Sequence, residues 1–397
     1  MRISGRLLAI SAIVVASASP VTPVTGTRTI AVQLTSGTSA DTPLGDGTAL
    51  LMGGTSIPQP SQLYLDAADT LYLQSRGFTG TLQSLFTPED ASPTSEARGE
   101  QILDSTILQK FDSGDVSAQN PVVVFGYSQS ASISSAVMRE LAGQGVPSND
   151  VHFVLIGDPD SAAGGSEVVT SNLSPQYLQA NVATPNDLYP TDVYTHEYDG
   201  VADSPKYPID LLADLNASLG FVYEHGTYLS LTPEQIGDAI QLPTSAADTM
   251  VNYYMIPATS LPLLDPLRLI PVVGQPLYDL LEPDTRILVN LGYGSIDQGW
   301  APGDADVVSS SGSFPTDINL GDLLTALGNG LQKGVSDFIA DLGNPDTYQI
   351  TPLVENPSLS LVAEAGYLYG FLDTPHPTLS EALQGITELI QAFTATT

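Results

Sequence analysis

The sequence predicts an α/β fold with a central, mostly parallel sheet. Two short apolar runs, Val122 to Phe125 and Val151 to Ile156, have the β-branched and aromatic content of strands covered on both faces. The segment between them, from Ala131 to Leu141, favours helix and is followed by glycines suited to a helix C-terminus. A strand, helix, strand order implies a parallel connection, so we expect one sheet with helices on its faces.

The rest of the chain is expected to extend this pattern. Apolar spacing predicts helices over 62–74 and 96–111, then 211–222, and strands over 48–52 and 192–198. The stretch 231–292 is dense in leucine and proline, which predicts either a lid-like insertion over an apolar site or an irregular edge packed on the sheet. A last strand is expected over Arg286 to Leu291, and two amphipathic C-terminal helices over 320–342 and 378–393.

Four parts are expected along the chain. Residues 1–18 are predicted to be a signal peptide, 19–44 a flexible mature N-terminus, 45–300 the α/β domain, and 301–397 a linker with the C-terminal helices. Arg2 and Arg6 precede an apolar run that ends at Ala18, where small residues fit the rule for signal peptidase. The run is too short to span a bilayer, so we expect cleavage after Ala18 and a secreted or cell-envelope protein.

Composition excludes several classes of function. Lys plus Arg number 11 against 44 Asp plus Glu, and the net charge of −33 argues against nucleic acid and anionic lipid headgroups as partners. Cysteine is absent, which removes disulfides and thiolate chemistry. The acidic pairs at 158–160 and 304–306 do not follow a calcium-loop pattern, and no dinucleotide fingerprint occurs in the right context. We therefore expect neither a metal nor a cofactor.

A serine stands where the first predicted strand breaks into its helix. The pentapeptide is Gly126-Tyr127-Ser128-Gln129-Ser130, close to the G-x-S-x-G elbow that presents a nucleophilic serine. Its small first and last residues keep the turn tight, although serine replaces the last glycine. The strand before it and the helix after it favour a catalytic Ser128 over a serine that only caps a helix.

Ser128 needs a base and an acid to become reactive. Of the four histidines, His152 and His196 lie in predicted strands and are expected to be buried core residues, whereas His376 is far along the chain. His225 lies in a glycine-containing loop and is the preferred base. The order Ser, acid, His leaves the acid between Ser128 and His225, with these candidates after strands: Asp158, Asp160, Asp199 and Asp203. We favour Asp203, with Asp199 as the alternative.

Two backbone donors are expected to hold the oxyanion. The amide of Gln129 follows the nucleophile directly, and the loop Gly54-Thr55-Ser56, at the end of another predicted strand, would supply the second donor through Thr55. Paired glycines at 53 and 54 allow the backbone to come close. An ordinary glycine turn is the alternative for this loop.

Several segments in the same order resemble the PE-PPE domain of mycobacteria and related actinomycetes. These are Gly53-Gly54-Thr55, Gly126-Tyr127-Ser128-Gln129-Ser130, Tyr198-Asp199-Gly200-Val201-Ala202-Asp203, His225-Gly226-Thr227-Tyr228 and Asn290-Leu291-Gly292-Tyr293-Gly294. The resemblance covers about residues 45 to 300 and implies a cutinase-like α/β-hydrolase fold with a triad at Ser128, Asp203 and His225. We expect the signal peptide here in place of the helical PE or PPE module that often precedes this domain.

The resemblance also implies a class of substrate. It favours a secreted serine esterase or lipase-type hydrolase that acts on acyl esters or lipids through an acyl-enzyme. One alternative is an acyltransferase that moves acyl chains onto trehalose or another envelope glycolipid, and a second is a non-catalytic envelope protein that retains the fold. Peripheral association with the cell envelope is compatible with each of them.

Overall fold

A computed structural model describes residues 43–348, except 91, 174–181, 208, 248–249, 309–314 and 316. The expected signal peptide, all but the end of the segment 19–44, and the helix expected over 378–393 lie outside the described residues. Leu44, at the end of the segment expected to be flexible, is buried in the core and its amide donates to the carbonyl of Arg76 at 3.0 Å.

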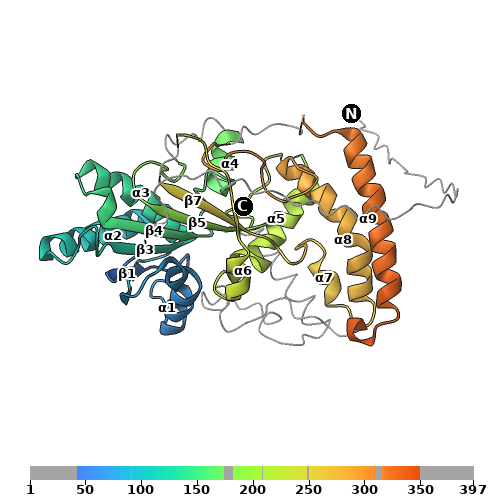
Figure 1. The fold of residues 1–397 in the computed structure, drawn as a ribbon, viewed down its shortest axis with the longest axis horizontal. Coiled ribbons are helices and arrows are strands. Elements are labelled where there is room, and N and C mark those ends of the chain that lie inside the picture. Colours follow the sequence, from blue (N-terminus) through green and yellow to red (C-terminus); the bar gives the residue numbers. More distant parts are fainter. Residues whose placement is uncertain are drawn as a thin grey trace, which may run out of the picture. The chain divides into compact units, whose positions relative to one another are not determined.

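Seven strands of the described chain form one sheet, parallel except for one edge strand (Figure 1). Across the sheet the strands are β2 (Thr81–Ser84), β1 (Thr48–Leu51), β3 (Val122–Tyr127), β4 (Val151–Ile156), β5 (Thr191–His196), β7 (Val251–Ile256) and the antiparallel β6 (Ile240–Gln241). Strands β3, β4 and β5 are fully buried, as continuous apolar or β-branched strands in a parallel sheet are. The predicted mostly parallel sheet is confirmed.

The helices divide between the two faces of the sheet. Alternate strand residues such as Val123 and Phe125 pack with the helix α1 (Gln62–Ala68), whereas Val122 and Val124 pack with two other helices, α2 (Pro93–Ser113) and α3 (Gln129–Gly143). Side chains of a strand point alternately to opposite faces, so each buried strand supplies both layers of the core. The turn between β3 and α3 therefore follows a strand that is packed on both faces.

The remaining helices follow β4 or later strands in the chain. They are α4 (Ser166–Leu173), α5 (Leu211–Tyr223), α6 (Pro233–Gly237), α7 (Asp265–Arg268), α8 (Gly274–Asn290) and α9 (Leu320–Asp341). Helix α9 runs beside α8 (Figure 1), and glycines allow the close approach. A Cβ on Gly334 would lie 2.2 Å from the carbonyl oxygen of Leu280. None of the helices among the described residues is long and apolar enough to cross a bilayer.

Two expectations about the stretch 231–292 need correction. It is not irregular throughout, because it contributes strand β7, which pairs with β5 and the edge strand β6. The strand expected over Arg286 to Leu291 is instead the last part of helix α8. Ile287 and Val289 suit a strand locally, but the helix that begins at Gly274 continues through them. Six residues are too few to distinguish the two periods when helix packing decides the outcome.

Candidate active site

Ser128 stands at a strained turn between β3 and α3. Its φ of 55° and ψ of −118° lie outside the regions that residues with side chains normally adopt. Such a conformation costs on the order of 1–3 kcal/mol and persists because the surrounding structure holds it. The amide of Ser128 donates to the carbonyl of Ile156 at 3.2 Å, which fixes the turn to the end of β4. This is the geometry of a nucleophile elbow.

The residues on either side of the turn are small because the backbone folds back closely. A Cβ on Gly126 would lie 2.8 Å from the carbonyl oxygen of Ser130. Ser130 is fully buried, and its hydroxyl accepts from the amide of Tyr127 at 2.8 Å and donates to the carbonyl of Tyr127 at 3.1 Å. The serine that replaces the last glycine of the motif is therefore fully accommodated.

His225 lies against Ser128, as the sequence predicts. Its Nε2 is 3.0 Å from Ser128 Oγ, and the ring is 4% exposed at the start of a short 3-10 turn after α5. Phe221 stacks on the imidazole with ring centroids 5.6 Å apart and an interplanar angle of 17°. The Tyr127 hydroxyl donates to the carbonyl oxygen of His225 at 3.0 Å. These contacts fix both the ring and its backbone.

The carboxylate that faces His225 belongs to Asp199 and not to Asp203. Asp199 Oδ2 lies 2.8 Å from His225 Nδ1, whereas Asp203 Oδ2 accepts from the amide of Tyr198 at 2.9 Å. The preference for Asp203 is therefore wrong, and the alternative that we kept, Asp199, makes the contact. Strand β5 ends at His196, and Tyr198 has a φ of 67°, so the backbone bends early and directs Asp199 towards the histidine.

The two carboxyl groups also differ in their electrostatic environment. Burial by itself raises the pKa of Asp199, but the neighbouring His225 and the hydrogen bonds from Val201 N and the Tyr228 hydroxyl hold the pKa below its usual value. Burial and the negative charges of Glu197 and Asp199 raise the pKa of Asp203 well above its usual value. Asp199 is thus suited to the anionic form and Asp203 to the neutral form.

Tyr228 is part of the site and was not predicted. Its hydroxyl donates to Asp199 Oδ2 at 2.8 Å and accepts from the amide of His196 at 2.8 Å. The signals in the sequence are its place three residues after His225, directly after the short turn, and its presence in the segment His225-Gly226-Thr227-Tyr228 that carries the resemblance. His196 itself is buried and pairs with Glu224 at 2.7 Å, which confirms the prediction of a core histidine.

His152 is the second histidine predicted to be a core residue, and this prediction is also confirmed. It is 5% exposed, and its Nε2 lies 3.2 Å from Asp192 Oδ2. Asp192 also accepts from Arg76 Nε at 2.9 Å. Neither His152 nor His196 contacts Ser128, so His225 is the histidine that the structure brings to the elbow.

The loop predicted to help hold an oxyanion lies beside the elbow. A Cβ on Gly54 would be 2.7 Å from the Tyr127 ring and 3.0 Å from Ser128 Cβ, so this backbone approaches the nucleophile as only glycine allows. The Thr55 hydroxyl donates to the side-chain oxygen of Gln129 at 3.3 Å. Gln129 begins α3, where amide groups have no acceptor within the helix. The oxyanion role of Thr55 and Gln129 stays a prediction.

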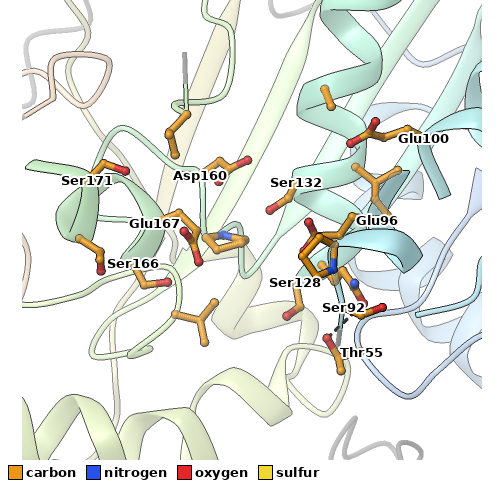
Figure 2. Close-up of a pocket in the computed structure, with 18 of the residues that line it drawn as sticks. Thr55, Ser92, Glu96, Glu100, Ser128, Ser132, Asp160, Ser166, Glu167 and Ser171 are labelled. Carbon is orange, nitrogen blue, oxygen red and sulfur yellow. Dashed lines mark hydrogen bonds between the residues drawn. The ribbon is translucent and has the colours of Figure 1, made fainter. Parts of the chain in front are cut away.

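A polar groove of about 760 Å³ opens beside Ser128 (Figure 2). Its hydroxyl groups belong to Thr55, Ser92, Ser128, Ser132, Ser166, Thr170 and Ser171, and its charged groups to Glu96, Glu100, Arg139, Asp160 and Glu167. Burial, followed by the like charge of Glu167, raises the pKa of Glu96. Burial and the charge of Asp158 raise the pKa of Asp160. No residue of 231–292 is among the described residues that line this groove, so a lid from that stretch finds no support here.

Comparison with known sequences identifies the family. The sequence model of the PE-PPE domain matches residues 78–294. The chain belongs to the PE-PPE domain family. It is 41% identical to the PPE family protein PPE28 of Mycobacterium tuberculosis over 74% of this chain and 46% of that protein. It is 38% identical to Esterase PE16 of the same organism over 82% of this chain and 63% of that protein. The chain thus spans about half to two thirds of these relatives.

Solved structures with a similar arrangement are distant from this PE-PPE domain. A cutinase-like protein from Cryptococcus sp. matches 40% of this chain and 80% of its own, with 20% identity and a TM-score of 0.31. The catalytic core of an acetyl xylan esterase from Trichoderma reesei matches 30% of this chain and 66% of its own, with 16% identity and a TM-score of 0.23.

Proposed function

We propose that this PE-PPE domain hydrolyses carboxylic esters through Ser128, His225 and Asp199. The observation that carries the proposal is the chain of contacts from Ser128 Oγ to His225 Nε2 (3.0 Å) and from His225 Nδ1 to Asp199 Oδ2 (2.8 Å). A strained elbow that presents the serine supports it. The 38% identity to a protein named Esterase PE16 supports it independently.

In the proposed reaction Ser128 Oγ attacks the ester carbonyl carbon while its proton passes to His225 Nε2. Asp199 accepts the hydrogen bond from His225 Nδ1–H and stabilises the imidazolium that forms. The amides of Gln129 and Thr55 would hold the negative oxygen of the tetrahedral intermediate. His225 then gives the proton to the departing alcohol, which leaves an acyl-Ser128. Water, deprotonated by His225, releases the carboxylic acid and restores the serine.

Replacement of the nucleophile tests this proposal. Ser128→Ala should lower kcat/KM for a p-nitrophenyl acyl ester by at least about a thousandfold, because the nucleophile and its base act as one unit. Ser105→Ala removes an exposed hydroxyl on α2 that bonds only to its own helix at Ile102 O, and it should retain the full rate. Equal rates for folded Ser128→Ala and unsubstituted protein would remove Ser128 from the mechanism. A fluorophosphonate that fails to label Ser128 would favour the non-catalytic alternative.

Acyl transfer to a sugar hydroxyl is the second candidate. The groove beside Ser128 favours it, because its hydroxyl groups donate and accept hydrogen bonds and its carboxylates accept them, as a polyhydroxylated acceptor requires. Trehalose or another envelope glycolipid would then take the acyl group in place of water. Incubation with an acyl ester and trehalose, followed by mass spectrometry, distinguishes the two. Free fatty acid as the only product would exclude transfer to this acceptor.

Export is proposed on the N-terminal sequence. Arg2 and Arg6 before an apolar run ending at Ala18 support a signal peptide, with location outside the cell or in the envelope. Mass spectrometry of protein recovered from the culture medium and from the envelope should find Ser19 as the first residue. Protein that stays inside the cell with Met1 in place would overturn this.

A further inference from the structure

We propose that the acyl chain of the ester binds along the outward face of α5, from Phe221 at the catalytic histidine towards Leu211. This inference rests on the proposed ester hydrolysis and adds the place where the chain lies. It begins from the polarity of the groove. A hydrocarbon chain there would cover Glu96, Glu100 and Asp160 without giving them partners, which is unfavourable. Ile133, Ala136 and Val201 also line the groove, but its carboxyl groups favour another direction for the chain.

Helix α5 offers an apolar surface that is exposed. Leu211 is 71% exposed, Leu215 55%, and Leu212 38%, and Ile209 just before the helix is 56% exposed. Exposed leucines are ordinary when they are single, but several along one short helix form a surface that favours an apolar ligand. No exposed charged side chain separates Leu211, Leu212 and Leu215, because Asp214 is partly buried.

The opposite side of α5 is fixed in place. Ala213, Asn216, Ala217 and Gly220 are buried. A Cβ on Gly220 would lie 1.8 Å from the carbonyl oxygen of Tyr198, so the helix rests directly on the loop that carries Asp199. The exposed leucines consequently cannot turn inwards without displacing the residues that hold the catalytic carboxylate.

Phe221 connects this surface to the site. It is 38% exposed and stacks on His225, whose Nε2 is 3.0 Å from Ser128 Oγ. From Phe221 back to Leu211 the helix covers ten residues, or about 15 Å. A chain that extends from the acyl carbonyl past Phe221 thus crosses Ser218, whose hydroxyl is already bonded to the carbonyl of Asp214 at 2.8 Å, and then meets Leu215 and Leu211. Each methylene that leaves water on such a surface favours binding by about fourfold.

Chain-length selectivity tests the inference. The measured quantity is kcat/KM for p-nitrophenyl octadecanoate divided by kcat/KM for p-nitrophenyl butanoate. The double variant Leu211→Ser with Leu215→Ser should lower this ratio about tenfold or more, because only the longer chain extends to these residues. The matched control is Leu324→Ser with Leu331→Ser on α9. These leucines are 62% and 59% exposed, and the control should keep the ratio of the unsubstituted protein.

The outcomes separate this inference from the proposed function. One outcome is that hydrolysis depends on Ser128 while the α5 variant keeps the ratio of the unsubstituted protein. This would contradict the proposed acyl-chain site but not the proposed ester hydrolysis. Activity that survives Ser128→Ala, or the absence of hydrolysis of both esters, would overturn both. A loss of self-association in the α5 variant, seen by sedimentation, without a change in the ratio would assign this face to a second copy of the chain instead.

Discussion

The amide of Asp203 donates a hydrogen bond to the carbonyl of Asp199 at 2.6 Å, so both carboxyl groups belong to one turn. Asp199 Oδ2 nevertheless faces His225, while Asp203 Oδ2 accepts from the amide of Tyr198. The backbone of Tyr198, with its φ of 67°, separates the strand from the turn and directs the two groups to different partners. One acid is placed to orient the base, and the other holds the turn together.

This difference predicts opposite results for the same substitution. Asp199→Asn should lower kcat/KM for a p-nitrophenyl ester by about a thousandfold or more, because a neutral amide neither stabilises the imidazolium nor holds the required tautomer. Asp203→Asn should change the rate by less than about tenfold, since an amide oxygen can still accept from Tyr198 N. Steady-state kinetics on both folded variants checks this, and the reverse order of effects would assign the catalytic role to Asp203.

Glu89 gives a prediction about pH and stability. It is fully buried beside the Thr55 loop, where its carbonyl accepts from the Ser56 amide at 2.7 Å. Burial raises the pKa of Glu89 from 4.5 to about 7. The hydrogen bond from Thr87 opposes part of this rise, and the negative charge of Glu96 adds a smaller one. Because the folded pKa is above the unfolded one, the stability from Glu89 is present below about 4.5 and is lost as the pH rises through about 7.

Glu89→Gln should therefore lessen the loss of stability over this pH range. The pKa difference corresponds to on the order of 3 kcal/mol in the free energy of unfolding between the two ends of the range. Urea unfolding at several pH values between them measures it. Glu234→Gln, at an exposed position on α6, is the control and should keep the pH dependence of the unsubstituted protein. An unchanged slope in Glu89→Gln would show that Glu89 ionises equally in both states.

The contact between α8 and α9 gives a third prediction. Gly334→Ala places a methyl group 2.2 Å from the carbonyl oxygen of Leu280 and should lower the free energy of unfolding by about 1–3 kcal/mol. Gly328→Ala on the same helix meets nothing within 4 Å and should raise it by up to about 1 kcal/mol, because alanine favours helix. Chemical denaturation of both variants is the measurement. A Gly334→Ala variant as stable as Gly328→Ala would show that the two helices do not pack closely.

The features that depend on local sequence could be predicted. The buried strands β3 and β4 and the turn at Ser128 follow from a short apolar run, a glycine and a helix-forming segment. His225 could be chosen because the other histidines lie in strands or far along the chain. These predictions succeeded because each rests on a pattern of a few neighbouring residues.

The predictions that failed concern features that depend on contacts between residues far apart in the sequence. Whether Asp199 or Asp203 faces His225 depends on where β5 ends and on the backbone conformation of Tyr198. Neither of these can be predicted from the residue types alone. Arg286 to Leu291 suits a strand by composition but continues α8, where Arg286 lies near Glu197 and Tyr198. Tertiary packing overrides local propensity at both places.

Ser130 has a consequence for recognising this turn in other sequences. Its hydroxyl accepts from the amide of Tyr127 and donates to the carbonyl of the same residue. Serine at this position therefore stabilises the turn in place of glycine. A search pattern that insists on glycine at this place would discard sequences that form the same turn. A pattern that allows any residue at this position would match many unrelated sequences. A pattern that allows glycine, or a side chain short enough to hydrogen-bond to the main chain three residues earlier, keeps the physical requirement of the turn.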